Sequence, residues 1–155
     1  MSVKPEKRMT LLVGMRQRRE RAVRQAFGAA QGKFHAADGE VKRLRGLLKR
    51  QDEQARSNLL GGAADPAAME AYRQSIGEIR VALGEGTGRL EATRAELERR
   101  RAGLLEALRQ RKVAENLRRR LEAKTATEAA RREAKAGEDL YASRSASASM
   151  AEVEG

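Results

Sequence analysis

Only two prolines, Pro5 and Pro66, occur in this chain of 155 residues. Proline is tolerated in the first turn of an α-helix but breaks a helix interior. The two prolines therefore leave two long stretches that can be helical, from about residue 6 to 60 and from about 66 to 142. The composition agrees, because aromatic residues make up only 3% of the chain and the residues that dominate it are strong helix formers.

The segment between these stretches has the residues of a helix end followed by a helix start. Gly61 and Gly62 suit the C-terminal cap of the first helix. Asp65 suits the N-cap of the second, with Pro66 in the first helical position. A turn at about 61–65 is short, and short linkers join antiparallel neighbours. We therefore expect the two helices to fold back on each other.

Apolar residues recur in both stretches with the alternating spacing of four and three that a heptad requires. In the first stretch the repeat consists of Val23, Phe27, Ala30, Phe34, Ala37, Val41, Leu44, Leu48, Gln51 and Ala55. In the second stretch it consists of Met69, Tyr72, Ile76, Ile79, Leu83, Gly86, Leu90, Thr93 and Leu97. Later apolar residues are more loosely spaced. The predicted fold is all-α, a long two-helix antiparallel coiled-coil hairpin with a helical C-terminal extension.

The two helices differ in length. Folding about residue 63 pairs position i with about 126 minus i, so the second helix outruns the first by about twenty residues. The surplus, residues 124–144, is expected to be a single helix. This gives a hairpin domain over 1–144, and the Ser/Ala-rich residues 145–155 are expected to form a disordered tail. Each arm would be on the order of 80 to 110 Å long, since a helix rises about 1.5 Å per residue.

Positive charge gathers in the part of each expected hairpin arm that lies away from the turn. The net charge is +11, with eight Lys/Arg against two Glu in residues 1–24 and nine against three in residues 97–120. These two segments face each other in an antiparallel hairpin, so the end that carries the termini should be a basic tip. Such a charge suits an acidic partner. Charge alone does not distinguish nucleic acid, anionic lipid and an acidic protein surface.

The stretch VALGEGTGRL, residues 81–90, resembles a phosphate-binding loop at first sight. A P-loop requires GxxxxGK[ST], and a dinucleotide fingerprint lies between a strand and a helix. Here Arg89 and Leu90 follow Gly88, and the preceding apolar residues have helical spacing. The alternative interpretation is a weakened helix, because each glycine costs about 1 kcal/mol relative to alanine.

No catalytic constellation or metal site is expected. The chain has no cysteine and a single histidine, His35, and its carboxylates occur in Glu/Arg mixtures typical of solvated helix faces. The sequence therefore predicts a non-enzymatic protein without a cofactor. The apolar runs are too short to span a bilayer, and we see no signal peptide, so we expect a cytoplasmic location without direct membrane insertion.

Two function classes fit a basic coiled coil without further information. A nucleic-acid-binding protein would use the Lys and Arg side chains for phosphate contacts. The stacking aromatics that single-strand binding uses are missing, and there is no basic region leading into a leucine-zipper dimer. A structural adaptor, whose hairpin spaces its partners, is the other alternative.

The hairpin architecture, the opening AAMEAYRQSIGEIRVAL of the second helix and the ending RKVAENLRRRLEAKTATEAARREAKAGEDLYASR together resemble the FliJ/YscO family. These are stalk proteins of flagellar and virulence type III secretion systems. The resemblance covers roughly residues 8 to 144. It implies an antiparallel coiled coil similar to the central stalk of rotary ATPases, located in the cytoplasm and peripherally associated with the membrane export apparatus.

The resemblance also implies partners. The end that carries both termini would insert into the hexameric export ATPase, and some members of the family bind export chaperones. The basic tip would be this ATPase-facing end. The residues assigned to it are Arg16, Arg18, Arg19, Arg21, Arg118, Arg119, Arg120, Arg131 and Arg132.

A second contact implied by the resemblance is with the cytoplasmic domain of the membrane export gate. In the family this surface lies on both helices toward the turn, and on the second helix it follows the tyrosine by three, seven and ten residues. The residues carried over are Leu44, Leu47, Leu48, Gln51, Tyr72, Ser75, Ile79 and Ala82. Relatives can carry an aromatic residue at the position of Ser75. The sequence does not separate a flagellar from a virulence system.

Overall fold

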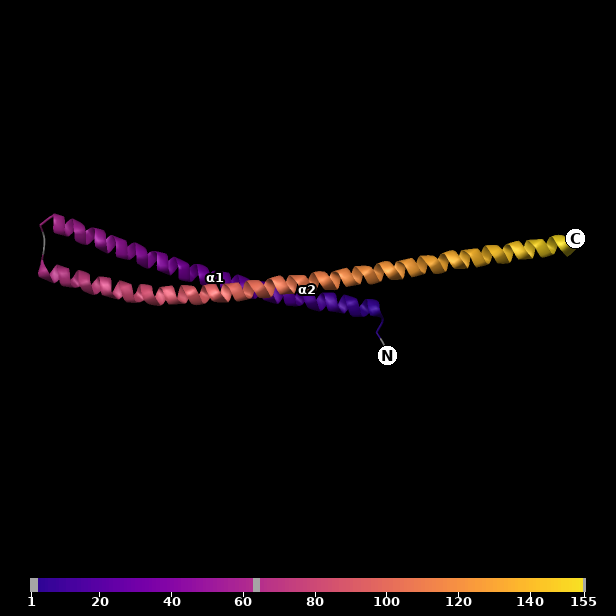
Figure 1. Cartoon of the computed structure of the whole chain (residues 1–155), viewed down its shortest axis with the longest axis horizontal. Coiled ribbons are helices and arrows are strands. Elements are labelled where there is room, and N and C mark those ends of the chain that lie inside the picture. Colours follow the sequence, from indigo (N-terminus) through magenta and orange to yellow (C-terminus); the bar gives the residue numbers. More distant parts are fainter. Residues whose placement is uncertain (1–2, 63–64, 155) are drawn as a thin grey trace. The chain divides into compact units, whose positions relative to one another are not determined.

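The computed structural model describes residues 3–62 and 65–154 and contains two helices in those residues, with no strand. Helix α1 is Pro5–Leu60 and helix α2 is Pro66–Glu154 (Figure 1). The two long helices pack against each other in antiparallel directions, which confirms the predicted all-α hairpin class. The prediction placed the first helix at about 6–60, and in the structure α1 starts at Pro5.

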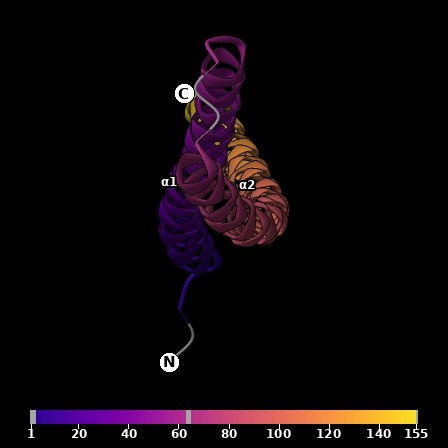
Figure 2. The same ribbon diagram turned by 90° about the vertical axis from the view of Figure 1, so that its left-hand side faces the viewer.

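The helix ends beside the turn face the viewer in Figure 2. Their caps are those that the residues there favour. Gly62 has a φ of 78°, the left-handed conformation that glycine adopts at a helix C-terminus. The amide of Gly61 donates to the carbonyl of Ser57 at 3.0 Å. Asp65 accepts a hydrogen bond from the amide of Ala67 through Oδ1 at 3.1 Å, as an N-cap residue does. The remaining residues of the predicted turn, 63 and 64, lie outside the described residues.

Contacts between the helices agree with the predicted register. Arg16 donates from Nη1 to Oε1 of Gln110 at 2.7 Å, and these residue numbers add up to 126. A Cβ added at Gly103 would lie 3.8 Å from Cγ1 of Val23, a pair with the same sum. These two contacts agree with the pairing of position i with about 126 minus i, and the bond between Tyr72 and Asp52 lies within two residues of it.

The chain divides into two compact units, and both helices contribute to each. We call Arg19–Leu108 the turn unit, and the residues up to Arg18 with those from Arg109 onward the terminal unit. In the turn unit the residues of the apolar repeat are buried or half-buried between the helices. The buried apolar residues of this unit are Ala30, Val41, Leu44 and Ile76 of the repeat and, beyond its end at Leu97, Ala107. Dispersed small and aliphatic side chains thus form a narrow core along this unit.

The terminal unit has a different seam. Val13 and Ala114 are its buried apolar residues, with 2% and 3% of their surface exposed. The heptad continues on α2 with the spacing of the turn unit, but half-buried arginines, Arg111 and Arg118, occupy positions of the repeat. The apparent loosening of the repeat after Leu97 is therefore a change of residue type at unchanged positions.

The last part of α2 has no packing partner among the described residues. Every residue from 122 to 154 is exposed. The structure nevertheless continues α2 from the predicted end at 142 to Glu154, through most of the segment expected to be a disordered tail. The physical reason is that no proline or glycine follows Gly137 before that point, and the alternating Ser and Ala residues include good helix formers. Residue 155 is not described.

The three glycines of the GEGTG stretch lie within α2, so they form no loop. Gly86 is buried, and a Cβ added there would lie 3.5 Å from Cγ2 of Val41. Gly84 and Gly88 are exposed and have open space around them. This agrees with the interpretation of a helical segment with low intrinsic propensity, and it contradicts a phosphate-binding loop.

Candidate functional site

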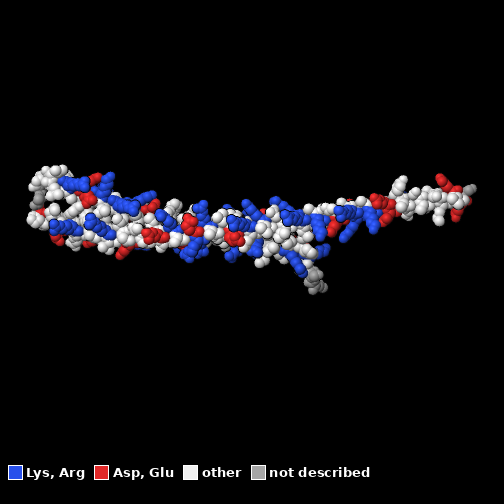
Figure 3. Space-filling view, viewed as in Figure 1, with Lys and Arg blue, Asp and Glu red and all other residues white. Residues whose placement is uncertain are grey.

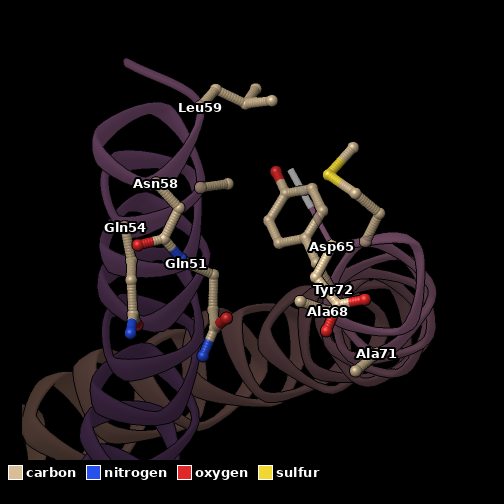
Figure 4. A pocket seen from close by; sticks show the side chains of 10 residues that line it. Gln51, Gln54, Asn58, Leu59, Asp65, Ala68, Ala71 and Tyr72 are labelled. Atoms are coloured by element: carbon tan, nitrogen blue, oxygen red, sulfur yellow. The ribbon is translucent and has the colours of Figure 1, made fainter. Parts of the chain in front are cut away.

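A cleft separates the two helices beside the turn (Figure 4). It has a volume of about 290 Å³ and lies within the turn unit. Three amide side chains, Gln51, Gln54 and Asn58, line it from α1, and Met69 and Tyr72 line it from α2. Amide side chains of α1 therefore face Met69 and Tyr72 of α2 across this cleft.

Tyr72 is held in this cleft by a side chain of the opposite helix. Its hydroxyl donates to Oδ1 of Asp52, so the bond joins α2 to α1 near the turn. This hydrogen bond raises the pKa of Tyr72 above its ordinary value, because it is lost with the phenolic proton and the neighbouring carboxylate disfavours a phenolate. Tyr72 was predicted to lie in the seam, but nothing in the sequence indicated that Asp52 is its partner. Many carboxylates of this chain lie next to the apolar repeat, so Asp52 did not stand out among them.

All residues predicted to contact the export gate lie in the turn unit. Their numbers pair across the helices: Leu44 lies level with Ala82, and Leu47 with Ile79, in the observed register. Leu44 is buried at 5% exposure, and the other seven are half-buried. The structure therefore brings these residues together in and beside the seam, where each exposes only an edge. None of these eight residues is exposed.

The residues predicted to contact the ATPase are divided between the two units. Arg19 and Arg21 belong to the turn unit and are exposed. The others belong to the terminal unit, where Arg18, Arg119, Arg120, Arg131 and Arg132 are exposed and Arg16 and Arg118 are half-buried. Figure 3 shows Lys and Arg side chains along the helices and a final part of α2 that is largely uncharged.

Two of these arginines have structural contacts that the sequence did not indicate. Arg16 makes the cross-helix bond to Gln110 described above. Arg118 is half-buried in the seam, and its buried Nε lies 3.6 Å from Oε1 of Glu122, outside hydrogen-bond distance. Arg131 and Arg132 lie in the part of α2 that has no packing partner. A basic tip built from these residues thus combines seam contacts with free surface charges.

Ion pairs in the turn unit follow the helical spacing of three or four residues. Arg43 bonds both carboxylate oxygens of Glu40 and lowers the pKa of that carboxyl below its ordinary value. The hydrogen bonds from Arg100 lower the pKa of Glu96 in the same way. Such exposed pairs stabilise a helix weakly. Their arrangement is that of a solvated helix face.

Among residues 3–62 and 65–154, no cluster of three or more His, Cys, Asp or Glu side chains could hold a metal ion. His35 is exposed, and its ring lies edge-on to Phe34 at a centroid distance of 5.7 Å. Within the same described residues, neither helix has a segment that is both apolar and long enough to cross a bilayer.

The length of the match with a known family decides the relationship. The sequence model of the family described as flagellar FliJ protein matches residues 5–150. The chain belongs to the FliJ family. This membership confirms the resemblance inferred from the hairpin, the opening of the second helix and the basic ending. Comparison with curated proteins and with solved structures gave no significant match. For this FliJ-family chain, the partner surfaces are therefore proposals.

Proposed function

We propose that this FliJ-family chain is a non-enzymatic stalk and coupling component of a type III protein export apparatus. In this proposal it works in the cytoplasm, peripherally associated with the membrane export machinery. The observation that carries it is the family match over residues 5–150, together with the predicted hairpin class. Membership favours a flagellar system, since the family is described as flagellar.

The terminal unit is the proposed contact for the hexameric export ATPase. It carries most of the arginines assigned to that contact, and several of them are fully exposed. Positive side chains suit a negatively charged binding site and speed its encounter with the partner. Export chaperones, which some relatives bind, are further proposed partners. The turn unit is the proposed contact for the cytoplasmic domain of the export gate.

A binding assay with the purified export ATPase tests the first contact. Reversing the charge of two exposed arginines, Arg119→Glu and Arg120→Glu, should abolish hexamer binding and the stimulation of ATP hydrolysis. Deleting residues 1–24 should do the same. These two arginines are better probes than Arg118, because Arg118 is half-buried in the seam. A matched reversal in the turn unit, Arg45→Glu with Lys49→Glu, changes the net charge equally and should leave ATPase binding intact.

The result that contradicts the stalk function is unchanged ATPase binding by both the reversal and the deletion. Tight binding to mixed DNA or RNA that weakens steeply with salt would instead support the nucleic-acid alternative. A hairpin that binds neither ATPase nor nucleic acid but joins two other proteins would support the adaptor alternative.

The gate contact is tested with a residue that the seam does not need. Ser75 is half-buried, and relatives of this family can have an aromatic side chain at this position. Ser75→Phe should therefore strengthen binding to the gate's cytoplasmic domain, since an aromatic ring adds apolar area to the contact. The control is Ser57→Phe, an exposed position in the last turn of α1. Equal affinities for both variants and the unchanged chain would contradict this placement of the gate contact.

A further inference from the structure

Several apolar side chains of the terminal unit lie outside its seam, and four of them, Leu12, Met15, Val113 and Leu117, lie close to it. Met15 on α1 and Val113 and Leu117 on α2 are exposed at 61%, 58% and 46%. Leu12 is half-buried. The seam of the same unit meanwhile contains arginines at heptad positions. Exposed apolar residues that form one contiguous patch are typical of a surface that a partner covers.

A hydrogen bond between the helices fixes these four residues to one face. The hydrogen bond from Arg16 to Gln110 spans the helices on that face. Leu12 lies one helical turn before Arg16 on α1, and Val113 and Leu117 follow Gln110 by three and seven residues on α2, so they lie on the same stripe. Met15 lies three residues after Leu12. The four side chains therefore border a single groove between the helices, which we call the apolar groove.

The charges around the apolar groove are mostly positive. Arg8, Arg120 and Lys124 lie three, four or seven residues from its members and extend both stripes, and all three are exposed. In residues 3–18 and 109–124 the carboxylates are Glu6, Glu115 and Glu122. Helical spacing places each of them on another side of its helix, and Glu115 bonds Arg111 there. The rim is thus mainly basic, and the carboxylate on the same stripe is Glu106, seven residues before Val113 and on the side of the turn unit.

We propose that the apolar groove binds an acidic amphipathic helix of a protein partner. Apolar side chains of that helix, spaced by three and four residues, would pack between Met15 and Val113 on the floor formed by Leu12 and Leu117. Its flanking Asp and Glu side chains would pair with the basic rim. The complex is then a local three-helix bundle, with hydrophobic burial for affinity and charge for orientation. This names the chemistry of the terminal unit's partner and in that sense rests on the proposed function.

Charge and side-chain type favour this occupant over two others. A second copy of the terminal unit would bring a basic rim against a basic rim, which is repulsive. An anionic membrane would satisfy the rim, but a membrane-surface helix buries one continuous apolar face of its own, whereas these apolar residues are shared between two packed helices. The groove is instead lined by three aliphatic side chains and a methionine, the residues with which helices pack on helices.

The probe is a synthetic helical peptide of about six turns with leucines on one face and glutamates beside them, titrated against the full chain by fluorescence anisotropy. The double variant Met15→Gln with Val113→Gln should weaken binding at least about tenfold, as loss of central apolar contacts does. A peptide with lysines in place of the glutamates should bind at least about tenfold more weakly than the acidic one. The matched control is Leu140→Gln with Val153→Gln, since both residues are exposed in the unpaired part of α2.

Circular dichroism of the double variant should show unchanged helicity and melting temperature, because both side chains are exposed. The proposal is overturned if the double variant binds the acidic peptide as well as the unchanged chain does. It is also overturned if the lysine peptide binds equally well, if only anionic lipid vesicles bind, or if the double variant merely abolishes dimers in sedimentation.

The same variants separate this proposal from the stalk function. If the unchanged chain fails to bind the export ATPase while the peptide results are as expected, the stalk function fails and the apolar groove stands. If the chain binds the ATPase but the double variant shows no defect with the acidic peptide, the groove proposal fails and the stalk function stands.

Discussion

The same heptad spacing runs through the turn unit and the terminal unit, but different residue types occupy it. In the turn unit Val41 is 1% exposed and packs beside Gly86 on the opposite helix. In the terminal unit the corresponding positions hold Val13 and Ala114. Arginines occupy the neighbouring positions of the repeat. The apolar side chains that the terminal seam lacks lie on its outer surface. Both units expose some apolar side chains, such as Val81 in the turn unit and Met15 in the terminal unit, so the two units differ mainly in which residue types occupy the seam.

The difference shows that a regular repeat does not guarantee a uniform core. Spacing sets which positions meet between the helices, while residue type decides how much apolar area each position buries. The half-buried arginines at seam positions of the terminal unit bury less apolar area than aliphatic residues there would, so this unit should unfold locally at lower cost.

A charge placed in each seam gives the largest expected contrast. Val41→Asp puts a carboxylate in the buried apolar seam of the turn unit and should lower the free energy of unfolding by about 4 kcal/mol. Ala114→Asp puts the same group among the arginines of the terminal unit and should cost much less. Urea denaturation followed by circular dichroism measures both, with the exposed Val81→Asp as the control. Equal losses for Val41→Asp and Ala114→Asp would remove the distinction between the two seams.

The glycines of the turn unit should yield the next effect, in the opposite direction. Gly84→Ala with Gly88→Ala should raise the free energy of unfolding by about 2 kcal/mol, because each glycine costs about 1 kcal/mol in a helix interior. Both positions have open space for a methyl group. Gly86→Ala should also stabilise, since its new Cβ would meet Val41 at an ordinary contact distance of 3.5 Å. Thermal melting checks this, and a lower melting temperature for Gly86→Ala would show that the seam needs the smaller residue. If protein export by the triple alanine variant is normal, local softness at this point has no role.

The unpaired part of α2 should contribute little to stability. Removing residues 122–154 should leave the melting temperature nearly unchanged, because every one of the described residues there is exposed. Amide hydrogens of this segment should exchange much faster than those around Val41, since an isolated helix is marginal in water. Hydrogen exchange read by mass spectrometry measures this. Slow exchange throughout 122–154 in the free chain would mean that the segment is stabilised by contacts other than those of the hairpin.

The smallest expected effect is alkaline and concerns the hydrogen bond across the turn-unit cleft. The pKa of Tyr72 is raised by its bond to Asp52, so this bond contributes stability below the ordinary tyrosine value of 10.0 and loses it as the pH rises through the folded value. A phenolate absorbance titration should show one tyrosine ionising late. Asp52→Asn should bring that ionisation to lower pH, and Tyr72→Phe should remove it. An unchanged titration in Asp52→Asn would mean that the bond is absent in solution.

Much of the fold could be predicted from the sequence because a few residues with strong preferences mark it. The prolines, Gly62 and Asp65 fix where helices can begin and end, and the heptad fixes which faces meet. The helix beyond residue 142 could not be predicted, because Ser/Ala-rich composition is compatible with both helix and disorder when nothing packs on it. Arginines at seam positions were likewise missed, since an arginine in a basic sequence carries no signal of its burial.

The candidate sites were less predictable than the fold. Residues carried over from the family, such as Leu44 and Ile79, turned out to lie in or beside the seam, where packing and recognition use the same side chains. The apolar groove could have been suspected from Leu12, Met15, Val113 and Leu117 once the register was known. The spacing alone does not show that the pair on α1 and the pair on α2 lie on the same face. The contact between Arg16 and Gln110 shows this.

The fixed sum of residue numbers across the helices also limits how a chain of this kind can change in length. A single residue inserted in one arm would turn all later side chains of that arm by about 100° and move apolar residues out of the seam. Seven residues inserted in one arm restore its face but leave the other arm short by two helical turns. Related hairpins should therefore differ in length by matched steps of seven in both arms, or by changes confined to the turn and the unpaired end.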